Sequence, residues 1–221
     1  MRFRDRIDAG RQLASQLMAY ANRSDVIVLA LPRGGVPVAF EVARALDARL
    51  DVLLVRKLGV PGHPELAMGA VAAGGVRVLS EDLISELGIP APLVEEVSVR
   101  ERLELERREK LYRGDRPFPS LENRVAIVID DGLATGATVE AAVAALRGSG
   151  GPAGIVVAAP VGAHATCARL KAVADDVVCA QTPEPFYSVG MWYERFEQTT
   201  DEEVIALLEQ AAHDRQPARK M

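Results

Sequence analysis

Short runs of apolar residues alternate along this chain with segments that have the periodicity of amphipathic helices. Each run is too short for a helix and lacks the alternation of a half-exposed strand, so the runs predict strands that are buried on both faces. Strands that alternate with helices are typical of an α/β fold, with a mostly parallel sheet covered by helices. The predicted strands are Val26–Leu31, Asp51–Val55, Val125–Ile129, Ile155–Ala159 and Val177–Ala180, and the predicted helices are Val36–Leu46, Thr138–Leu146 and Ala165–Val173.

The composition restricts the class of protein and of partner. The chain has 221 residues, of which 49% are hydrophobic and 26% charged, and this fits one soluble domain over residues 1–221. The net charge of -5 argues against a broad nucleic-acid-binding face, although 26 Lys and Arg residues leave room for a local anion pocket.

The start of the chain and its two cysteines bear on the cellular compartment. The charged start MRFRDRIDAG does not resemble a signal peptide, and no segment has the length of a membrane span. We therefore expect a cytoplasmic protein with no membrane or nucleic-acid partner. In that reducing compartment, Cys167 and Cys179 are expected to remain unlinked.

Some segments depart from the strand–helix alternation. Residues 58–75 are rich in Gly and Pro and are too long for a plain connection. A charged helix is predicted over Glu95–Lys110, within an insertion of about residues 91–113. In this helix an acidic residue precedes a basic one by four positions in three pairs: Glu96/Arg100, Glu104/Arg108 and Glu106/Lys110. Such pairs favour a solvated helix. The alternative is that the helix makes contacts between subunits of an oligomer. Aromatic residues gather irregularly over residues 181–198, before a last helix with a capping box at Thr200 and Glu203.

Ligands of such sheets bind beyond the carboxyl ends of the strands, which directs attention to the sequence DDGLATGAT after Ile129. Gly136 lets a ligand approach the backbone, and Thr135 and Thr138 add hydroxyl donors. The first N–H groups of the following helix complete a cradle for a phosphate. The residues assigned to this cradle are Ala134, Thr135, Gly136, Ala137 and Thr138.

Asp130 and Asp131 lie on the strand side of this cradle. Carboxylates repel phosphate, so their expected targets are hydroxyl groups or a metal ion. A phosphate next to vicinal hydroxyls describes a ribose 5-phosphate. The alternative is that one Asp caps the turn and the other is solvated.

A second anion loop is predicted in LPRGGVPVA, which also follows a buried strand and opens a helix. Gly34 and Gly35 expose backbone N–H groups, and Arg33 adds a guanidinium donor. A tight turn with a surface arginine is the alternative that the residues leave open.

Lys57 ends the next strand pattern, in LLVRKLG. Side chains alternate along a strand, so only one of Arg56 and Lys57 is expected to face the site, and we favour Lys57. The alternative is a pair of solvated cations. With Lys57 near the second loop, the two loops together suit a ligand that carries a phosphate at one end of a ribose and a pyrophosphate at the other.

The stretch VAIVIDDGLATGATVEAA resembles the phosphoribosyl-pyrophosphate signature of the type I phosphoribosyltransferases, and PRGGVPVA resembles their pyrophosphate loop. The resemblance covers most of Asp25 to Phe196. With RDRIDAGRQLA near the start, the whole chain is most similar to bacterial members of the family whose acceptor is not established. The resemblance implies a Rossmann-like core with a five-strand parallel sheet, a mobile loop at about residues 58–75, and a small hood formed by residues 181–198 and the N-terminal segment.

The same resemblance implies a Mg²⁺-dependent transfer of phosphoribose from 5-phosphoribosyl 1-diphosphate to a nitrogenous base or amine, in nucleotide or nucleoside metabolism. It assigns catalysis to Asp130, Asp131 and Lys57, with both aspartates holding the ribose hydroxyls and Mg²⁺, directly or through water. The resemblance assigns pyrophosphate binding to Arg33, Gly34, Gly35 and Lys57. It also implies a non-proline cis peptide bond near Arg33–Gly34. A non-catalytic sensor of the same ligand is the alternative function, and the oligomeric state stays open, with homodimers common among relatives.

The sequence restricts the chemical identity of the acceptor only by making one class of base less likely. Relatives that act on 6-oxopurines usually have an acid where this chain has Ala134, which disfavours hypoxanthine and guanine. Phe186 and Tyr187 are the residues that we expect to stack on a flat acceptor, although a hydrophobic plug over the sheet edge is an equal alternative.

Overall fold

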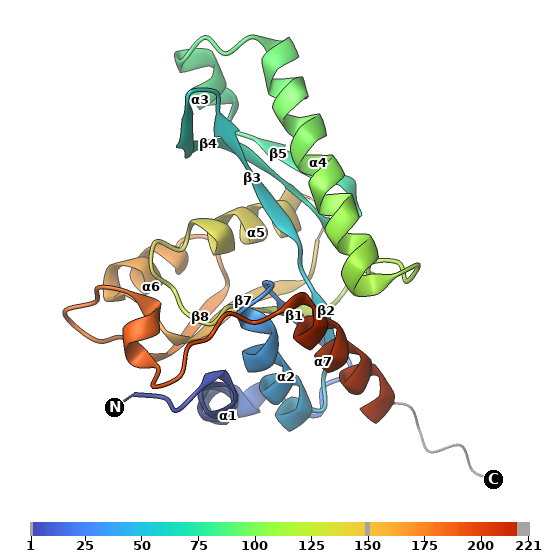
Figure 1. The fold of residues 1–221 in the computed structure, drawn as a ribbon, viewed down its shortest axis with the longest axis vertical. Coiled ribbons are helices and arrows are strands. Elements are labelled where there is room, and N and C mark those ends of the chain that lie inside the picture. Colours follow the sequence, from blue (N-terminus) through green and yellow to red (C-terminus); the bar gives the residue numbers. More distant parts are fainter. Residues whose placement is uncertain (1, 149–150, 216–221) are drawn as a thin grey trace.

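The computed structural model describes residues 2–148 and 151–215, with a five-stranded parallel sheet at its centre (Figure 1). The strand order is β2-β1-β6-β7-β8, which confirms the predicted parallel α/β sheet. These strands are β1 (Val26–Ala30), β2 (Arg49–Val52), β6 (Val125–Ile129), β7 (Gly154–Val161) and β8 (Asp176–Gln181). One boundary differs from the prediction, because the run from Asp51 is divided between the end of β2 and a separate strand that begins at Val55.

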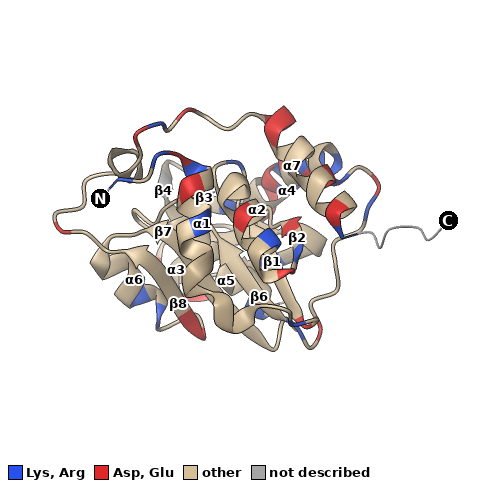
Figure 2. Cartoon of the chain, turned by 90° about the horizontal axis from the view of Figure 1, so that it is seen from below, with Lys and Arg blue, Asp and Glu red and all other residues tan. Residues whose placement is uncertain are grey.

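Helices cover both faces of this sheet, and alternate residues of each strand explain why. Val28 and Ala30 of β1 pack on one side with α1 (Arg6–Gln16), α2 (Gly35–Leu46) and α7 (Asp201–Asp214). Ile27 and Leu29 pack on the other side with α5 (Ala137–Gly148) and α6 (His164–Leu170). In Figure 2 the central strands are tan, whereas charged residues colour the surrounding helices and loops. The unbroken apolar runs in the sequence therefore correspond to strands that are buried on both faces.

An arm, defined here as residues 55–113, rises from the core beside this sheet (Figure 1). It contains a three-stranded antiparallel sheet of order β3-β4-β5. The segment expected as a mobile loop is thus folded as a hairpin of β3 and β4, and its mobility stays a prediction. The elements of the arm are β3 (Val55–Val60), β4 (His63–Ala72), η2 (Ala73–Gly75), β5 (Val76–Leu79), α3 (Glu81–Glu86) and α4 (Ala91–Arg113).

The charged helix α4 is longer than its strongest pattern and is not simply solvated. It buries Val94, Val97, Leu105 and Tyr112 in the main core, so the expectation of a fully solvated helix is wrong. Charge dominated the pattern, whereas burial needs only the narrow stripe of residues that faces β3, β4 and α7. Among the predicted pairs, Glu104 and Arg108 do form an ion pair, at 2.8 Å.

The N-terminal segment and the aromatic segment after β8 pack together into one cluster, called the hood below (residues 2–5 and 181–198). Phe3 bridges to Tyr193, and both are buried with Ala9 and Val161. Phe186, Val189 and Trp192 are half-buried against them. The remaining short helices are η1 (Met18–Tyr20) and η3 (Val189–Trp192), and the predicted capping box at Thr200 and Glu203 opens α7.

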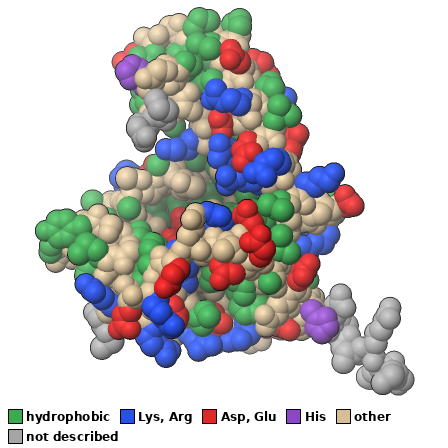
Figure 3. Space-filling view, in the orientation of Figure 1, with side chains coloured by type: hydrophobic (Ala, Val, Ile, Leu, Met, Phe, Trp, Pro, Cys, Tyr) green, Lys and Arg blue, Asp and Glu red, His purple; other side chains and the backbone are tan. Residues whose placement is uncertain are grey.

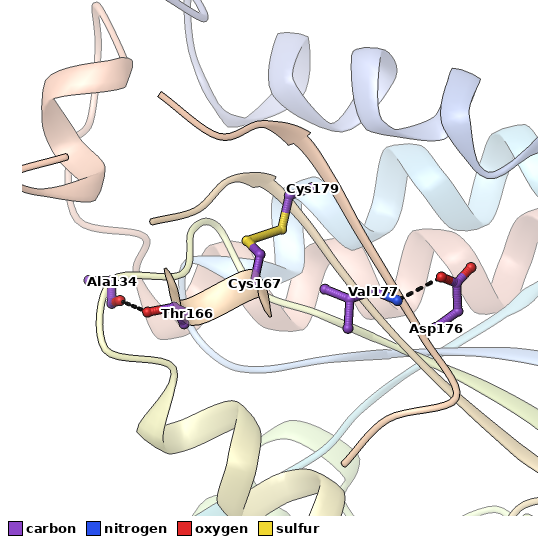
Figure 4. Close-up of a disulfide and its surroundings, with 6 residues drawn as sticks. All are labelled: Ala134, Thr166, Cys167, Asp176, Val177 and Cys179. Carbon is purple, nitrogen blue, oxygen red and sulfur yellow. Dashed lines mark hydrogen bonds between the residues drawn. A yellow bond between two sulfur atoms is a disulfide. The ribbon is translucent and has the colours of Figure 1, made fainter. Parts of the chain in front are cut away.

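The cysteines contradict the sequence-based expectation. Cys167 in α6 and Cys179 in β8 are joined as a disulfide, with Cα atoms 7.1 Å apart (Figure 4). The crossover from β7 through α6 lays this helix against the end of β8, a proximity that the spacing of the cysteines in the sequence does not reveal. Within the described ranges, no helix is long and apolar enough to cross a membrane.

Candidate active site

The two predicted anion loops lie side by side because their strands are neighbours. β1 and β6 pair in parallel with Ala30 opposite Ile129, so the chain leaves both strands at the same edge of the sheet. A Cβ atom at Gly34 would lie 2.0 Å from Oδ2 of Asp131, and one at Gly35 would lie 2.6 Å from the carbonyl oxygen of Ile129. Glycine at both positions therefore lets one loop rest directly on the other.

The loop after β1 contains a cis peptide bond between Pro32 and Arg33, next to the position where the resemblance placed one. The N–H of Val36 donates to the carbonyl oxygen of Arg33 at 3.1 Å, which closes the turn into α2. The Arg33 guanidinium lies 3.8 Å from Oδ1 of Asp201, at the start of α7. The residue that we assigned to pyrophosphate is therefore already next to a carboxylate.

The loop after β6, from Ala134 to Thr138, opens α5 as its sequence predicted. α5 begins at Ala137, so the first N–H groups of the helix have no acceptor within it and can bind an anion. The N–H of Ala137 donates to Oγ1 of Thr135 at a long 3.5 Å. Gly136 has a φ of 74°, in the left-handed region that glycine adopts without steric cost. Thr135 and Thr138 are both exposed, which leaves both hydroxyl groups accessible to a ligand.

Helix α6 supports this loop from behind. The Thr166 hydroxyl donates to the carbonyl oxygen of Ala134 at 2.6 Å (Figure 4). The guanidinium of Arg169 donates to the carbonyl oxygen of Thr135. A Cβ atom at Gly136 would lie 2.6 Å from Cγ2 of Thr166, so α6 and the loop are in direct contact. The carbonyl groups thus point toward α6, and the opposite side of the loop stays open.

An arginine that the sequence reading missed holds the aspartate pair. Nε and Nη2 of Arg6 lie 2.9 and 2.8 Å from Oδ2 of Asp131. The Arg6 guanidinium also donates to the carbonyl oxygen of Glu197 at 2.6 Å and lies 4.0 Å from the ring centre of Phe196. The side chains of Arg6 and Asp131 are only 12% and 16% exposed, so this is a largely buried ion pair. The charged N-terminal segment was the sole signal in the sequence, and nothing in it indicated a partner.

The surroundings of the two carboxyl groups change their acidity. Burial, and then the neighbouring charge of Asp131, raise the pKa of Asp130 to about 7. Burial also raises the pKa of Asp131, while the charge and hydrogen bonds of Arg6 oppose the rise. The hood reaches this pair through Tyr193, whose hydroxyl donates to the carbonyl oxygen of Asp131 at 2.6 Å. A cation or a set of hydroxyl groups that binds here must compete with a proton on Asp130 near neutral pH.

Lys57 was expected to end a strand of the core sheet. It lies instead on β3, in the arm. Both Lys57 and Arg56 line a cavity of about 690 Å³, whose wall includes Thr138 of the phosphate loop. The cavity therefore gives no preference for Lys57 over Arg56, and which of them faces a ligand stays a prediction. β3 is the edge strand of its sheet, and a cavity at a sheet edge is open to side chains from both faces. Arg56 is the more restrained of the two, because Nη2 lies 2.6 Å from Oε2 of Glu101.

The two aromatic residues proposed for the acceptor differ in their surroundings. Phe186 is half-buried in the hood cluster, whereas Tyr187 is 76% exposed. Their role toward an acceptor stays a prediction.

The comparisons with known proteins agree with this arrangement. A family model described as the phosphoribosyl transferase domain matches residues 3–67 and 65–191. Proteins from two strains of Mycobacterium tuberculosis, provisionally named phosphoribosyl transferases, are 48% identical over 212 residues, which are 96% of this chain and 47% of theirs. The chain thus spans about half the length of these curated relatives.

Solved structures show the same fold. A crystal structure of a Thermus thermophilus protein has a TM-score of 0.85 and 44% identity, and the match covers 95% of this chain and 99% of that one. An Aquifex aeolicus structure with a TM-score of 0.50 and 12% identity, matched over 84% of this chain and 78% of that one, shares the fold alone. Since the family model spans most of the described chain and covers both anion loops, this protein belongs to the phosphoribosyltransferase family.

Proposed function

We propose that the protein binds 5-phosphoribosyl 1-diphosphate with Mg²⁺ and transfers the phosphoribosyl group to a nitrogenous base or an amine, releasing pyrophosphate. The observation that carries this proposal is the direct contact between the Asp130–Asp131 pair and the Gly34 loop, with the phosphate loop following in the same chain. A ribose at the aspartates would place its 5-phosphate toward Ala134–Thr138 and its C1 substituent toward Arg33.

The residues of the chain would share the work as follows. Backbone N–H groups of residues 134–138 would bind the 5-phosphate, and Asp130 and Asp131 would accept hydrogen bonds from the ribose hydroxyls. Arg33 and Lys57 would stabilise the negative charge that builds on pyrophosphate as the bond to C1 breaks and the acceptor nitrogen bonds to C1. The hood would cover the acceptor and limit the access of water.

The donor set at the aspartates fits Mg²⁺, which prefers carboxylate, phosphate and water oxygens. Two carboxylates supply fewer oxygens than the ion takes, so the diphosphate, the ribose and water would complete its coordination. When bound, the ion would neutralise charge on the leaving pyrophosphate.

Titration calorimetry with 5-phosphoribosyl 1-diphosphate, with and without Mg²⁺, tests this proposal on the wild-type protein. We expect binding that strengthens when Mg²⁺ is added. An absence of heat at millimolar ligand under both conditions would refute the proposal. A screen of bases and small amines for pyrophosphate release then separates transfer from sensing, because ligand binding without turnover of any acceptor favours the sensor.

The raised pKa of Asp130 predicts a pH dependence of binding. Below a pKa of about 7 the carboxyl group carries a proton, which Mg²⁺ and the ribose must displace. Affinity for the ligand with Mg²⁺ should therefore fall about tenfold per pH unit below that pKa and level off above it. Calorimetry across this range measures the profile.

The variant Asp130→Asn provides the control, because the ligand's own phosphates titrate equally with both proteins. Its binding should be weaker, and its pH dependence should lack the part that belongs to Asp130, leaving that of the ligand and of Asp131. Identical profiles for the variant and the wild type would contradict the assignment to Asp130.

A further inference from the structure

One face of α4 turns toward a cavity whose wall includes β3 and Thr138 of the loop after β6. Leu93, Val97 and Glu101 recur at helical spacing and line the cavity of about 690 Å³ together with Arg56 and Lys57. Figure 3 shows basic side chains along the hollow between the arm and the core. The charged helix that the sequence left without a role thus forms a wall of the cleft.

Arg108 continues this face at the end of the cleft that lies nearest both loops. A second cavity of about 40 Å³ is lined by Arg108 and Arg56 of the arm, by Pro32 of the loop after β1, and by Thr138 of the loop after β6. Arg108 is therefore adjacent to the space where a ligand that joins the two loops would lie. Its side chain is 36% exposed, so part of the guanidinium remains accessible.

Arg108 forms an ion pair within α4, and its neighbour Tyr112 links this part of α4 to α7. The Nε of Arg108 lies 2.8 Å from Oε1 of Glu104, one turn earlier on α4. Tyr112, one turn later, donates to Oδ1 of Asp201 at 2.5 Å, and Asp201 is also the carboxylate next to Arg33. Burial, and then the hydrogen bond to Asp201, raise the pKa of Tyr112 to about 12, while Arg108 and Arg33 oppose the rise. Arg33 and Arg108 therefore lie within electrostatic reach of the same phenol, as Arg107 also does.

In the proposed function, Lys57 of β3 and Mg²⁺ add positive charge for a diphosphate to what the loop after β1 supplies. Arg33 is the loop's one cation, and it already lies near Asp201. Arg108 comes from α4 and lines the same small cavity as Pro32, the neighbour of Arg33. A guanidinium suits phosphate oxygens because its planar donors can bind two of them at once.

We propose that Arg108 of α4 binds the pyrophosphate end of the ligand together with Arg33, so that the inserted arm helix completes the diphosphate subsite. This inference rests on the proposed function.

The test compares Arg108→Gln with the wild type by calorimetry, using inorganic pyrophosphate with Mg²⁺ and, separately, ribose 5-phosphate. Loss of one charge-assisted contact should weaken pyrophosphate binding about 10- to 100-fold. Binding of ribose 5-phosphate should stay within about twofold, because that ligand lacks the diphosphate. Arg108→Lys should recover part of the loss, since it keeps the charge without the planar donors.

Arg107→Gln is the matched control. Arg107 pairs with the same Glu104, also at 2.8 Å, but its side chain is 62% exposed and it is absent from the described lining of both cavities. Thermal unfolding of both variants checks that the fold is retained. Equal pyrophosphate affinity in Arg108→Gln, Arg107→Gln and the wild type would overturn the inference alone, whereas a wild type that binds neither 5-phosphoribosyl 1-diphosphate nor pyrophosphate would overturn the proposed function.

Discussion

Replacing Asp130 and Asp131 together by asparagine is expected to abolish binding of 5-phosphoribosyl 1-diphosphate with Mg²⁺ while the fold survives. The substitution removes both anionic acceptors for the ribose hydroxyls and the ion, and charge-assisted contacts of this kind make the expected loss on the order of 100-fold or more. The fold should survive at a cost of about 3 kcal/mol, because burial penalises the charged form of both carboxyl groups, whereas Asp131→Asn leaves the largely buried Arg6 guanidinium without its ionic partner. Calorimetry measures the affinity, and circular dichroism with thermal unfolding measures the fold.

The chain offers a second pair of adjacent aspartates as a control. Asp175 and Asp176 are exposed and lie where β8 begins, at the opposite end of the sheet from the site. The double variant Asp175→Asn/Asp176→Asn should bind the ligand like the wild type. An Asp130→Asn/Asp131→Asn protein that is folded and binds within about tenfold of the wild type would contradict the assignment of the ribose to this pair.

Replacing Arg6 by methionine should cost about 3 kcal/mol of the free energy of unfolding near pH 8, because it leaves the Asp131 carboxylate largely buried without its partner. Without Arg6, nothing of similar strength opposes the effect of burial, so the folded-state pKa of Asp131 should rise further above its unfolded value. A raised folded pKa means that stability is lost as the pH rises through it. The deficit of the variant should therefore shrink as the pH falls and Asp131 takes up a proton. Denaturant unfolding at several pH values measures it.

The neighbouring Arg4 gives the comparison for this result. Its side chain is 66% exposed and lies 3.5 Å from Asp8, so Arg4→Met should change stability by less than about 1 kcal/mol. Adding Asp131→Asn to Arg6→Met should restore part of the lost stability, since the unpaired charge is then gone. An Arg6→Met deficit that is equal at all pH values would point to lost packing on Phe196 instead of an unpaired carboxylate.

The core sheet and the position of the loops after β1 and β6 could be predicted because each depends on consecutive residues. An unbroken apolar run such as Val125–Ile129 reports burial on both faces, and the parallel arrangement then brings the loops to one edge. The arm was harder, because the run that begins at Asp51 continues across the boundary between β2 and β3, so nothing in the apolar pattern marked the change of sheet.

The parts that could not be predicted depend on contacts between distant residues. Arg6 and Asp131 are 125 positions apart, and an arginine in a charged segment is normally solvated. The disulfide of Cys167 and Cys179 likewise depends on how α6 docks on β8. Charge pattern also misled at α4, where a narrow apolar stripe between charged residues is sufficient for packing.

The hydrogen bonds from Thr166 and Arg169 to the phosphate loop have a thermodynamic consequence. Loops lose conformational entropy when they close on a ligand, and that loss reduces the affinity. Here, the carbonyl groups of Ala134 and Thr135 are fixed by α6 in the free protein, so the N–H groups on the other side already point outward. For the proposed phosphate site, the loop is preorganised, and the ordering of its backbone would belong to the folding of the protein instead of to each binding event.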